Sequence, residues 1–208
     1  YNTQTVDVTS SDGSTTSVTI PAGSTAGAIA AQFGAIDGIV ASASTSATIL
    51  QAGFVNSAPG GMSVSINGVN FQPVGSNPAE LLADLGTKIN ASALVGITAI
   101  TNASGDLNII QDQGSDLSFG FASTNLAHGY VVQGSNLASA PVPLSNTQTS
   151  ATVGGTVNIV LEDGTTIADD GNGTPLIDSF TGQPFVSNSF EPTDPDSYNH
   201  ATSRTIFD

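Results

Sequence analysis

The chain has 208 residues with 17 Asp or Glu and 2 Lys or Arg, so its formal net charge is −15. Nucleic acids and anionic membranes need cationic side chains, so this composition excludes both as partners. Without cysteine there are no disulfides or thiolate metal sites, and no run approaches the roughly 18 apolar residues of a membrane span.

A strand–strand–helix pattern opens the chain. Val6 and Val8 alternate with polar residues, and the alternation resumes after the turn at 11–13. Ser24 is placed to cap a short helix over 24–36, which Gly38 would end. The strands predicted for this region are 6–8, 18–20, 39–43 and 48–50.

Residues 62–111 carry the strongest pattern. Asn67-Gly68 separates two alternating runs and is the commonest signal of a two-residue hairpin. Asn77 can cap a helix over 78–91, with Pro78 at its first position and Glu80 where a capping box places an acid. Its apolar face consists of Leu81, Leu82, Leu85 and Ile89. Strands follow over 94–100 and 107–110, joined by a turn at 102–106.

The two helical regions share a spacing. Ile29 and Ile36 lie 5 and 12 positions after Ser24, as Leu82 and Ile89 do after Asn77. We interpret this as two ββαββ-like units, each burying its helix against its own hairpins. The alternative is that any short helix between strands produces such spacings.

The remainder of the chain is predicted as β structure. Residues 117–121 alternate, and Pro141 and Pro143 indicate an extended linker or edge segment at 140–144. Strand signals return at Ala151 and lead to a hairpin turn at 162–164. The predicted fold class is mainly β with two short helices (α+β), namely two ββαββ-like units followed by an antiparallel β segment. The predicted segments are 1–55, 56–145 and 146–208.

Few side chains suggest chemistry. His128 and His200 are the bases available at neutral pH, and neither stands in a local motif with a nucleophile. We expect His128 to lie in a turn and His200 to pack or hydrogen-bond beside Tyr198. We therefore predict that the protein is not an enzyme and has no catalytic residue.

Adjacent carboxylates form two acidic pairs. Glu162 and Asp163 belong to a turn, and so do Asp169 and Asp170, so solvated loops explain both. A Ca²⁺ loop over 169–172 is the alternative, although it presents only part of the alternating oxygen pattern that Ca²⁺ requires. We predict no metal site and no cofactor. Asn90, Asn102 and Asn172 match the glycosylation acceptor pattern, which is accidental if the protein is bacterial.

One resemblance rests on about fifty residues. Ser65-Ile66-Asn67-Gly68-Val69, a capped helix ending in Lys88-Ile89-Asn90, and Val95-Gly96-Ile97-Thr98-Ala99 resemble the flagellin IN motif. That motif recurs in the outer domains of flagellins, hook-associated proteins and filament caps. The resemblance implies an extracellular axial structural protein.

A second resemblance is sharper. The run 190–208, FEPTDPDSYNHATSRTIFD, is similar to a segment of the bacterial flagellar hook protein, in which aromatic-x-Pro-x-Asp-Pro-x-Ser-Tyr-Asn leads into a strand. Here Pro192 and Pro195 favour an extended approach, Tyr198 is an anchor, and 202–207 is a strand whose partner we expect beyond the fragment. The chain ends before the Ser-Leu-Gly that would complete the family pattern.

These resemblances imply the outer variable region of a hook protein, located outside the cell in the hook. We expect a fragment, since the chain begins at Tyr1 without a signal peptide. Its partners would be other copies of the same protein, bound through missing terminal helices and lateral outer-domain contacts. The isolated fragment should be monomeric. The alternatives are a secreted adhesin-like or carbohydrate-binding β module, the outer domain of a flagellin or filament cap protein, and, in third place, an enzyme.

Overall fold

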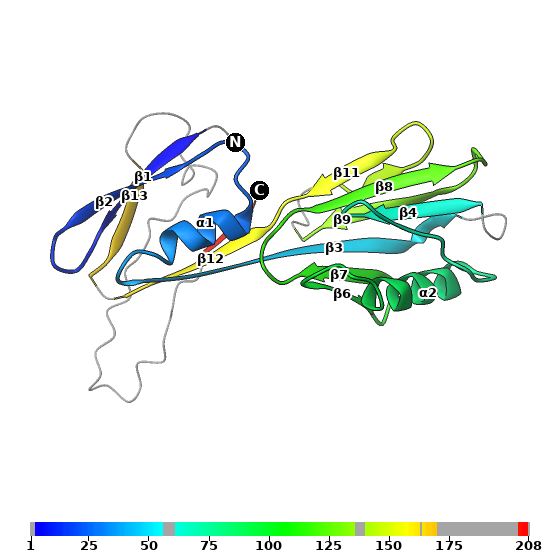
Figure 1. Ribbon diagram of the computed structural model, residues 1–208, viewed down its shortest axis with the longest axis horizontal. Coiled ribbons are helices and arrows are strands. Elements are labelled where there is room, and N and C mark those ends of the chain that lie inside the picture. Colours follow the sequence, from blue (N-terminus) through cyan, green and yellow to red (C-terminus); the bar gives the residue numbers. More distant parts are fainter. Residues whose placement is uncertain (1–2, 56–60, 136–139, 163, 170–203, 208) are drawn as a thin grey trace. The chain divides into compact units, whose positions relative to one another are not determined.

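The computed structural model describes residues 3–55, 61–135, 140–162, 164–169 and 204–207 (Figure 1). Its strands form three antiparallel sheets accompanied by two helices, which confirms the predicted mainly β fold class. The chain divides into two compact units. Unit 1 comprises residues up to Ala43 and from Thr156 onward, apart from Phe207, and unit 2 comprises Ser44–Gly155 with Phe207. The three-segment division into 1–55, 56–145 and 146–208 stays a prediction.

Unit 1 is assembled from sequence on both sides of unit 2. One three-stranded sheet has the order β13-β1-β2, with Val8 opposite Ile167 on one side and Thr16 on the other. The beginning of β3 and strand β12 also belong to this unit. The elements are β1 (Gln4–Thr9), β2 (Thr15–Ile20), α1 (Ala26–Phe33), β3 (Ile39–Val55), β12 (Thr156–Leu161) and β13 (Thr166–Asp169).

Helix α1 covers the core of unit 1. It packs against β2, which belongs to its own predicted hairpin, and also against β12, which lies more than a hundred residues later in the sequence and was not part of the predicted unit. Its N-cap is Thr25, whose Oγ1 accepts from the Ala28 N–H at 3.3 Å. The predicted cap, Ser24, instead donates its hydroxyl to the Pro21 carbonyl at 2.7 Å. The buried core consists of Val6, Val8, Val18, Ile20, Ala26, Ile29, Ala30, Phe33, Ile39, Val157, Ile159 and Ile167.

Strand β3 corrects another expectation, because the strands predicted at 39–43 and 48–50 form one continuous strand of 17 residues. Thr45, Ala47 and Ile49 alternate in burial as a strand requires. The small Ala and Ser side chains between 41 and 47 differ too little in hydrophobicity to make this period visible in the sequence. A register shift against β9 follows between Leu50 and Val55.

Unit 2 contains one four-stranded sheet and five strands of a seven-stranded sheet around one core. The four-stranded sheet has the order β11-β8-β4-β5. In the seven-stranded sheet β3 lies between β7 and β9, with β6 and β10 outside them, and the remaining strands are β12 and β14 of unit 1. Asn67 and Gly68 both have positive φ, as the predicted β4–β5 hairpin turn requires. The elements are β4 (Met62–Ile66), β5 (Val69–Phe71), α2 (Pro78–Asn90), β6 (Ile97–Thr101), β7 (Leu107–Gln111), β8 (Leu117–Ser123), β9 (Gly129–Gly134), β10 (Val142–Leu144) and β11 (Ser150–Val153).

Helix α2 begins as the sequence predicts. The Asn77 side chain accepts from the Glu80 N–H at 3.0 Å, and Pro78 occupies the first helical position. The capping box differs in one bond, because the Glu80 carboxylate accepts from the Ser76 N–H at 2.7 Å instead of from the Asn77 N–H. The predicted apolar face is buried against β5, β6 and β7.

Two strand pairings differ from the sequence interpretation. Residues around Glu162 and Gly164 do not close a hairpin, because β12 lies beside β3 whereas the following strand β13 pairs with β1. The C-terminal strand β14 (Arg204–Phe207) is the neighbour of β12, so it has a partner within the chain, whereas the sequence interpretation placed its partner beyond the fragment. Both pairings join segments that are distant in sequence, and a local residue pattern cannot predict such a pairing.

Candidate functional site

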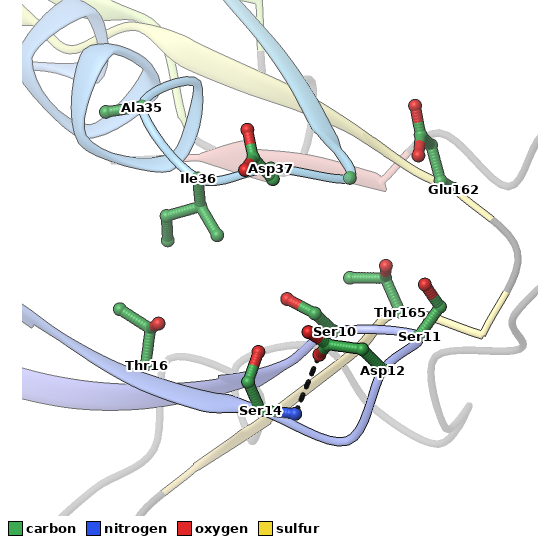
Figure 2. Close-up of a pocket in the computed structure, with 11 residues that line it drawn as sticks. Ser10, Ser11, Asp12, Ser14, Thr16, Ala35, Ile36, Asp37, Glu162 and Thr165 are labelled. Carbon is green, nitrogen blue, oxygen red and sulfur yellow. Dashed lines mark hydrogen bonds between the residues drawn. The ribbon is translucent and has the colours of Figure 1, made fainter.

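Three turns of unit 1 surround a cavity of about 430 Å³, shown in Figure 2. The turn from β1 to β2 supplies Asp12 and Ser14, the turn from α1 to β3 supplies Asp37, and the turn after β12 supplies Glu162 and Thr165. Because these residues carry carboxylates and hydroxyl groups, the lining of the cavity is acidic and polar. Main-chain hydrogen bonds join two of the three turns.

Backbone contacts hold the α1–β3 turn against the turn after β12. The Glu162 N–H donates to the Gly38 carbonyl at 2.8 Å, and the Thr165 N–H donates to the Glu162 carbonyl at 3.0 Å. Gly38 has φ +84°, and a Cβ there would lie 2.7 Å from the Thr165 hydroxyl oxygen. Any larger residue at position 38 would therefore both strain the backbone and push Thr165 aside.

One carboxylate of the cavity lining is held by its own turn. The Asp12 carboxylate accepts from the Ser14 N–H at 2.8 Å, and hydrogen bonding to the Ser14 hydroxyl and N–H holds the pKa of Asp12 below its usual value. No histidine, lysine or arginine is among the described residues that line the cavity. Within the described residues, no three His, Cys, Asp or Glu side chains come close enough to hold a metal ion.

A serine–histidine pair lies in unit 2, where the sequence offered no motif. His128 precedes β9, is 2% exposed, and places Nδ1 2.8 Å from the hydroxyl oxygen of Ser123 at the end of β8. The predicted turn is present, since the His128 N–H donates to the Asn125 carbonyl at 3.2 Å. Only the reversal of the chain between β8 and β9 brings the two side chains together.

The other contacts of Ser123 show what this pair holds together. The Ser123 hydroxyl lies within hydrogen-bond distance of the Gly61 carbonyl, at 2.6 Å, and accepts from the Asn125 N–H at 3.0 Å. Which atom donates between Ser123 and His128 Nδ1 depends on the tautomer of the imidazole. In either tautomer these contacts tie the β8–β9 connection to Gly61.

The asparagines of the two Ile-Asn pairs both bind main-chain groups of another segment through their side-chain oxygen and nitrogen atoms. Asn67 accepts through Oδ1 from the Ser118 N–H at 2.7 Å and donates from Nδ2 to the Asp116 carbonyl at 3.2 Å. Asn90 binds both main-chain groups of Ala99, accepting from its N–H and donating to its carbonyl, each at 2.8 Å. In each pair the isoleucine is buried in the core of unit 2 while the asparagine binds a neighbouring strand or its entry.

Some of the other candidate residues have structural roles, and the rest lie outside the described ranges. Asn102 accepts from the Ser104 and Asp106 N–H groups and so shapes the β6–β7 turn. The Nδ2 atoms of Asn90 and Asn102, where a glycan would attach, already donate to Ala99 and Asp106. Several candidates lie outside the described residues, namely Asp163, Asp170, Asn172, Tyr198 and His200, and Asp169 is described only in its backbone.

Comparisons with known proteins add no family. Neither the models of known protein families nor the curated proteins give a match to this chain. Neither helix in the described part of the chain has the length and apolar character needed to cross a membrane.

Proposed function

We propose that this chain is a structural part of the bacterial flagellum, the surface-exposed outer domain of a hook protein. The observation that carries the proposal is the run 190–208, whose Pro, Asp-Pro and Ser-Tyr-Asn positions resemble the hook protein segment. The proposed partners are other copies of the same protein in the flexible hook, and the proposed location is outside the cell.

The chain order of the two units supports the proposal. Unit 1 contains described residues from both sides of unit 2 in the sequence, so the chain leaves unit 1 after Ala43 and returns to it at Thr156. A nested module of this kind suits a domain that projects from an axial protein, because the insertion leaves the continuity of the carrying chain undisturbed.

The character of the polar groups also supports a structural role. Several asparagine side chains form hydrogen bonds with main-chain groups of the protein itself, namely those of Asn67, Asn90 and Asn102. Lys88, one of the two basic residues, pairs with Asp84 at 2.7 Å one helical turn away. A surface with so few cations forms few ion pairs with neighbours, which suits contacts that rearrange as a hook bends.

Immunogold electron microscopy of intact cells that produce the protein tests the proposal. Antibodies raised against the 208-residue chain should label the short curved segment between the cell surface and the filament. Serum absorbed beforehand with the same chain is the control and should leave that segment unlabelled.

Each other labelling pattern overturns the hook assignment in favour of a stated alternative. Gold along the filament would indicate a flagellin outer domain, and gold at the filament tip would indicate a cap protein. Label over the cell surface would indicate an adhesin-like or carbohydrate-binding β module.

A further inference from the structure

Strand β6 is an edge strand, because within the described residues it pairs only with β7 (Figure 1). The pairing places Thr98 opposite Ile110 and Ile100 opposite Asn108. Main-chain bonds at both ends of the pair, Asp112 N–H to the Gly96 carbonyl and Asn102 N–H to the Asp106 carbonyl, show which residues exchange hydrogen bonds with β7.

The bonds alternate along an antiparallel pair, so the even-numbered residues from Gly96 to Asn102 direct their N–H and C=O groups to β7. The main-chain N–H and C=O groups of the odd-numbered residues therefore point to the open edge of the sheet; these residues are Ile97, Ala99 and Thr101. Ala99 is the central one of these three, and both of its outward groups would be open to an additional strand.

Asn90 fills this central position. Its side-chain amide accepts from the Ala99 N–H and donates to the Ala99 carbonyl, both at 2.8 Å, which is the pair of bonds that a neighbouring strand would make. The last residue of α2 reaches the edge because the helix lies close to the hairpin. A Cβ at Gly86, one turn earlier, would come within 2.9 Å of the Leu107 side chain.

An unprotected β6 would be a strong template for strand addition. Gly96-Ile97-Thr98-Ala99-Ile100-Thr101 contains no charge and no proline and is rich in β-branched residues. Ile100 is 58% exposed and Val95, just before the strand, is 80% exposed, so apolar surface accompanies the edge. Charged residues, prolines and short strands are the usual protections of an edge, and β6 carries none of the first two.

Other edges of unit 2 are protected in more familiar ways. Edge strand β10 has three residues and contains Pro143, which has no N–H to offer. On edge strand β11 the Gln148 side chain donates to the Ser150 carbonyl at 2.7 Å. Asn90 therefore protects an edge strand as Pro143 and Gln148 do. It differs from Gln148 because it binds both the N–H and the carbonyl of one strand residue.

We propose that Asn90 acts as a one-residue substitute for a β-strand, sealing the β6 edge against strand addition by a second copy of this chain. The amide satisfies Ala99 without offering a further main-chain edge, so the sheet ends there. This inference is independent of the proposed function, because it concerns the edge of a sheet in any setting where copies meet at high concentration.

Replacement of Asn90 by Ala tests the proposal through two measurements on the 208-residue chain. In hydrogen exchange, the Ala99 amide should lose protection by at least tenfold, while the Thr98 and Ile100 amides bound to β7 keep theirs. In sedimentation at increasing concentration, the variant should self-associate where the unaltered chain stays monomeric.

Two further variants separate edge exposure from loss of stability. Asn102→Ala removes the bonds that shape the same hairpin but leaves Asn90 on Ala99, so it should remain monomeric. Adding Ile100→Lys to Asn90→Ala should restore the monomer by placing a charge on the edge strand, while the Ala99 amide stays unprotected.

The outcomes decide the proposal in either direction. A folded Asn90→Ala variant that remains monomeric, or that keeps Ala99 protected, overturns it, and so does equal association of Asn102→Ala. If Asn90→Ala does not fold, Asn90→Leu gives the same test, because it has nearly the same shape but offers neither the acceptor for the Ala99 N–H nor the donor to its carbonyl.

Discussion

Tyr130 joins the two sheets of unit 2 through a single polar contact. Its side chain is 1% exposed between Phe54 and Phe121, and its hydroxyl donates to the Gly120 carbonyl of the opposite sheet at 2.8 Å. Burial raises the pKa of Tyr130 well above its ordinary value, so the hydroxyl stays a donor over the whole range in which the protein is handled. A buried aromatic residue thus also fixes the alignment of the sheets.

Tyr130→Phe is expected to lower the free energy of unfolding by about 1–2 kcal/mol, because the Gly120 carbonyl loses its donor in a site closed to water. Urea denaturation followed by circular dichroism measures the change. Thr48→Val is the comparison, since it removes a hydroxyl bond to Asn108 in a partly exposed place and should cost less. Equal effects of the two variants would argue against a special role for the contact between sheets.

Asp116 lowers the stability of the folded state at neutral pH, whereas the Tyr130 hydroxyl raises it. Desolvation raises the pKa of its carboxyl above 3.8, and its buried Oδ1 has no hydrogen-bond partner among the described residues. The folded state therefore binds a proton more tightly than the unfolded state, and this group's contribution to stability declines as pH rises from about 3.8 through the folded pKa.

Asp116→Asn should consequently raise the free energy of unfolding at pH 7 by about 0.5 kcal/mol, a modest gain because the residue is only partly buried. The gain should vanish below pH 3.8, where the carboxyl is protonated in both states. Denaturation midpoints at several pH values measure it. Asp112→Asn makes the same change in net charge and controls for long-range effects, and a gain that persists at low pH would contradict the account.

At the scale of elements, α2 is held by its apolar face and by its two asparagines. Asn77 begins the helix and Asn90 ends it on β6, while Leu81, Leu82, Leu85 and Ile89 are each at most 2% exposed. The helix therefore closes the core of unit 2 and also seals the edge of one of its sheets.

Leu85→Ala should cost about 2–5 kcal/mol of unfolding free energy, because a fully buried leucine leaves a cavity when truncated. Leu126→Ala is the matched control. Leu126 is 85% exposed, so the same change should stay within about 0.5 kcal/mol. Chemical denaturation of both variants gives the two numbers, and a loss below about 0.5 kcal/mol for Leu85→Ala would contradict its place in the core.

At the scale of the whole molecule, unit 2 is continuous in sequence whereas unit 1 is not. The unit 2 core is drawn almost entirely from elements between Ser44 and Gly155. Unit 1 needs β12 and β13 from the far side of unit 2 to complete its core. The two units should therefore differ in whether they fold from a single fragment.

A fragment of residues 44–155 is expected to unfold cooperatively on its own, because it contains α2, the four-stranded sheet and five strands of the seven-stranded sheet, which together supply the core of unit 2. The predicted segment 56–145 is the control, since it omits β3, the central strand of one sheet, and β11, an edge strand of the other. Thermal unfolding followed by circular dichroism distinguishes them. A cooperative transition in 56–145 would instead support the segment division expected from the sequence.

Local sequence determined the elements that depend on neighbouring residues. The Asn67-Gly68 turn, the Asn77-Pro78 start of α2 and the apolar face of that helix were predictable, because caps, turns and helical periodicity involve residues within a few positions. The cap of α1 was wrong by one residue, since Ser24 and Thr25 are both good caps and only the backbone conformation distinguishes them.

Tertiary structure alone decided the rest. The packing of α1 on β12 and the pairing of β13 with β1 depend on where the chain returns. Asn90 reaches Ala99 only through the packing of α2 on β6. An asparagine at the end of a helix looks the same in sequence whether it faces water or a strand edge. Long-range pairing is set by the burial of the whole apolar surface at once, and no short window of sequence contains that information.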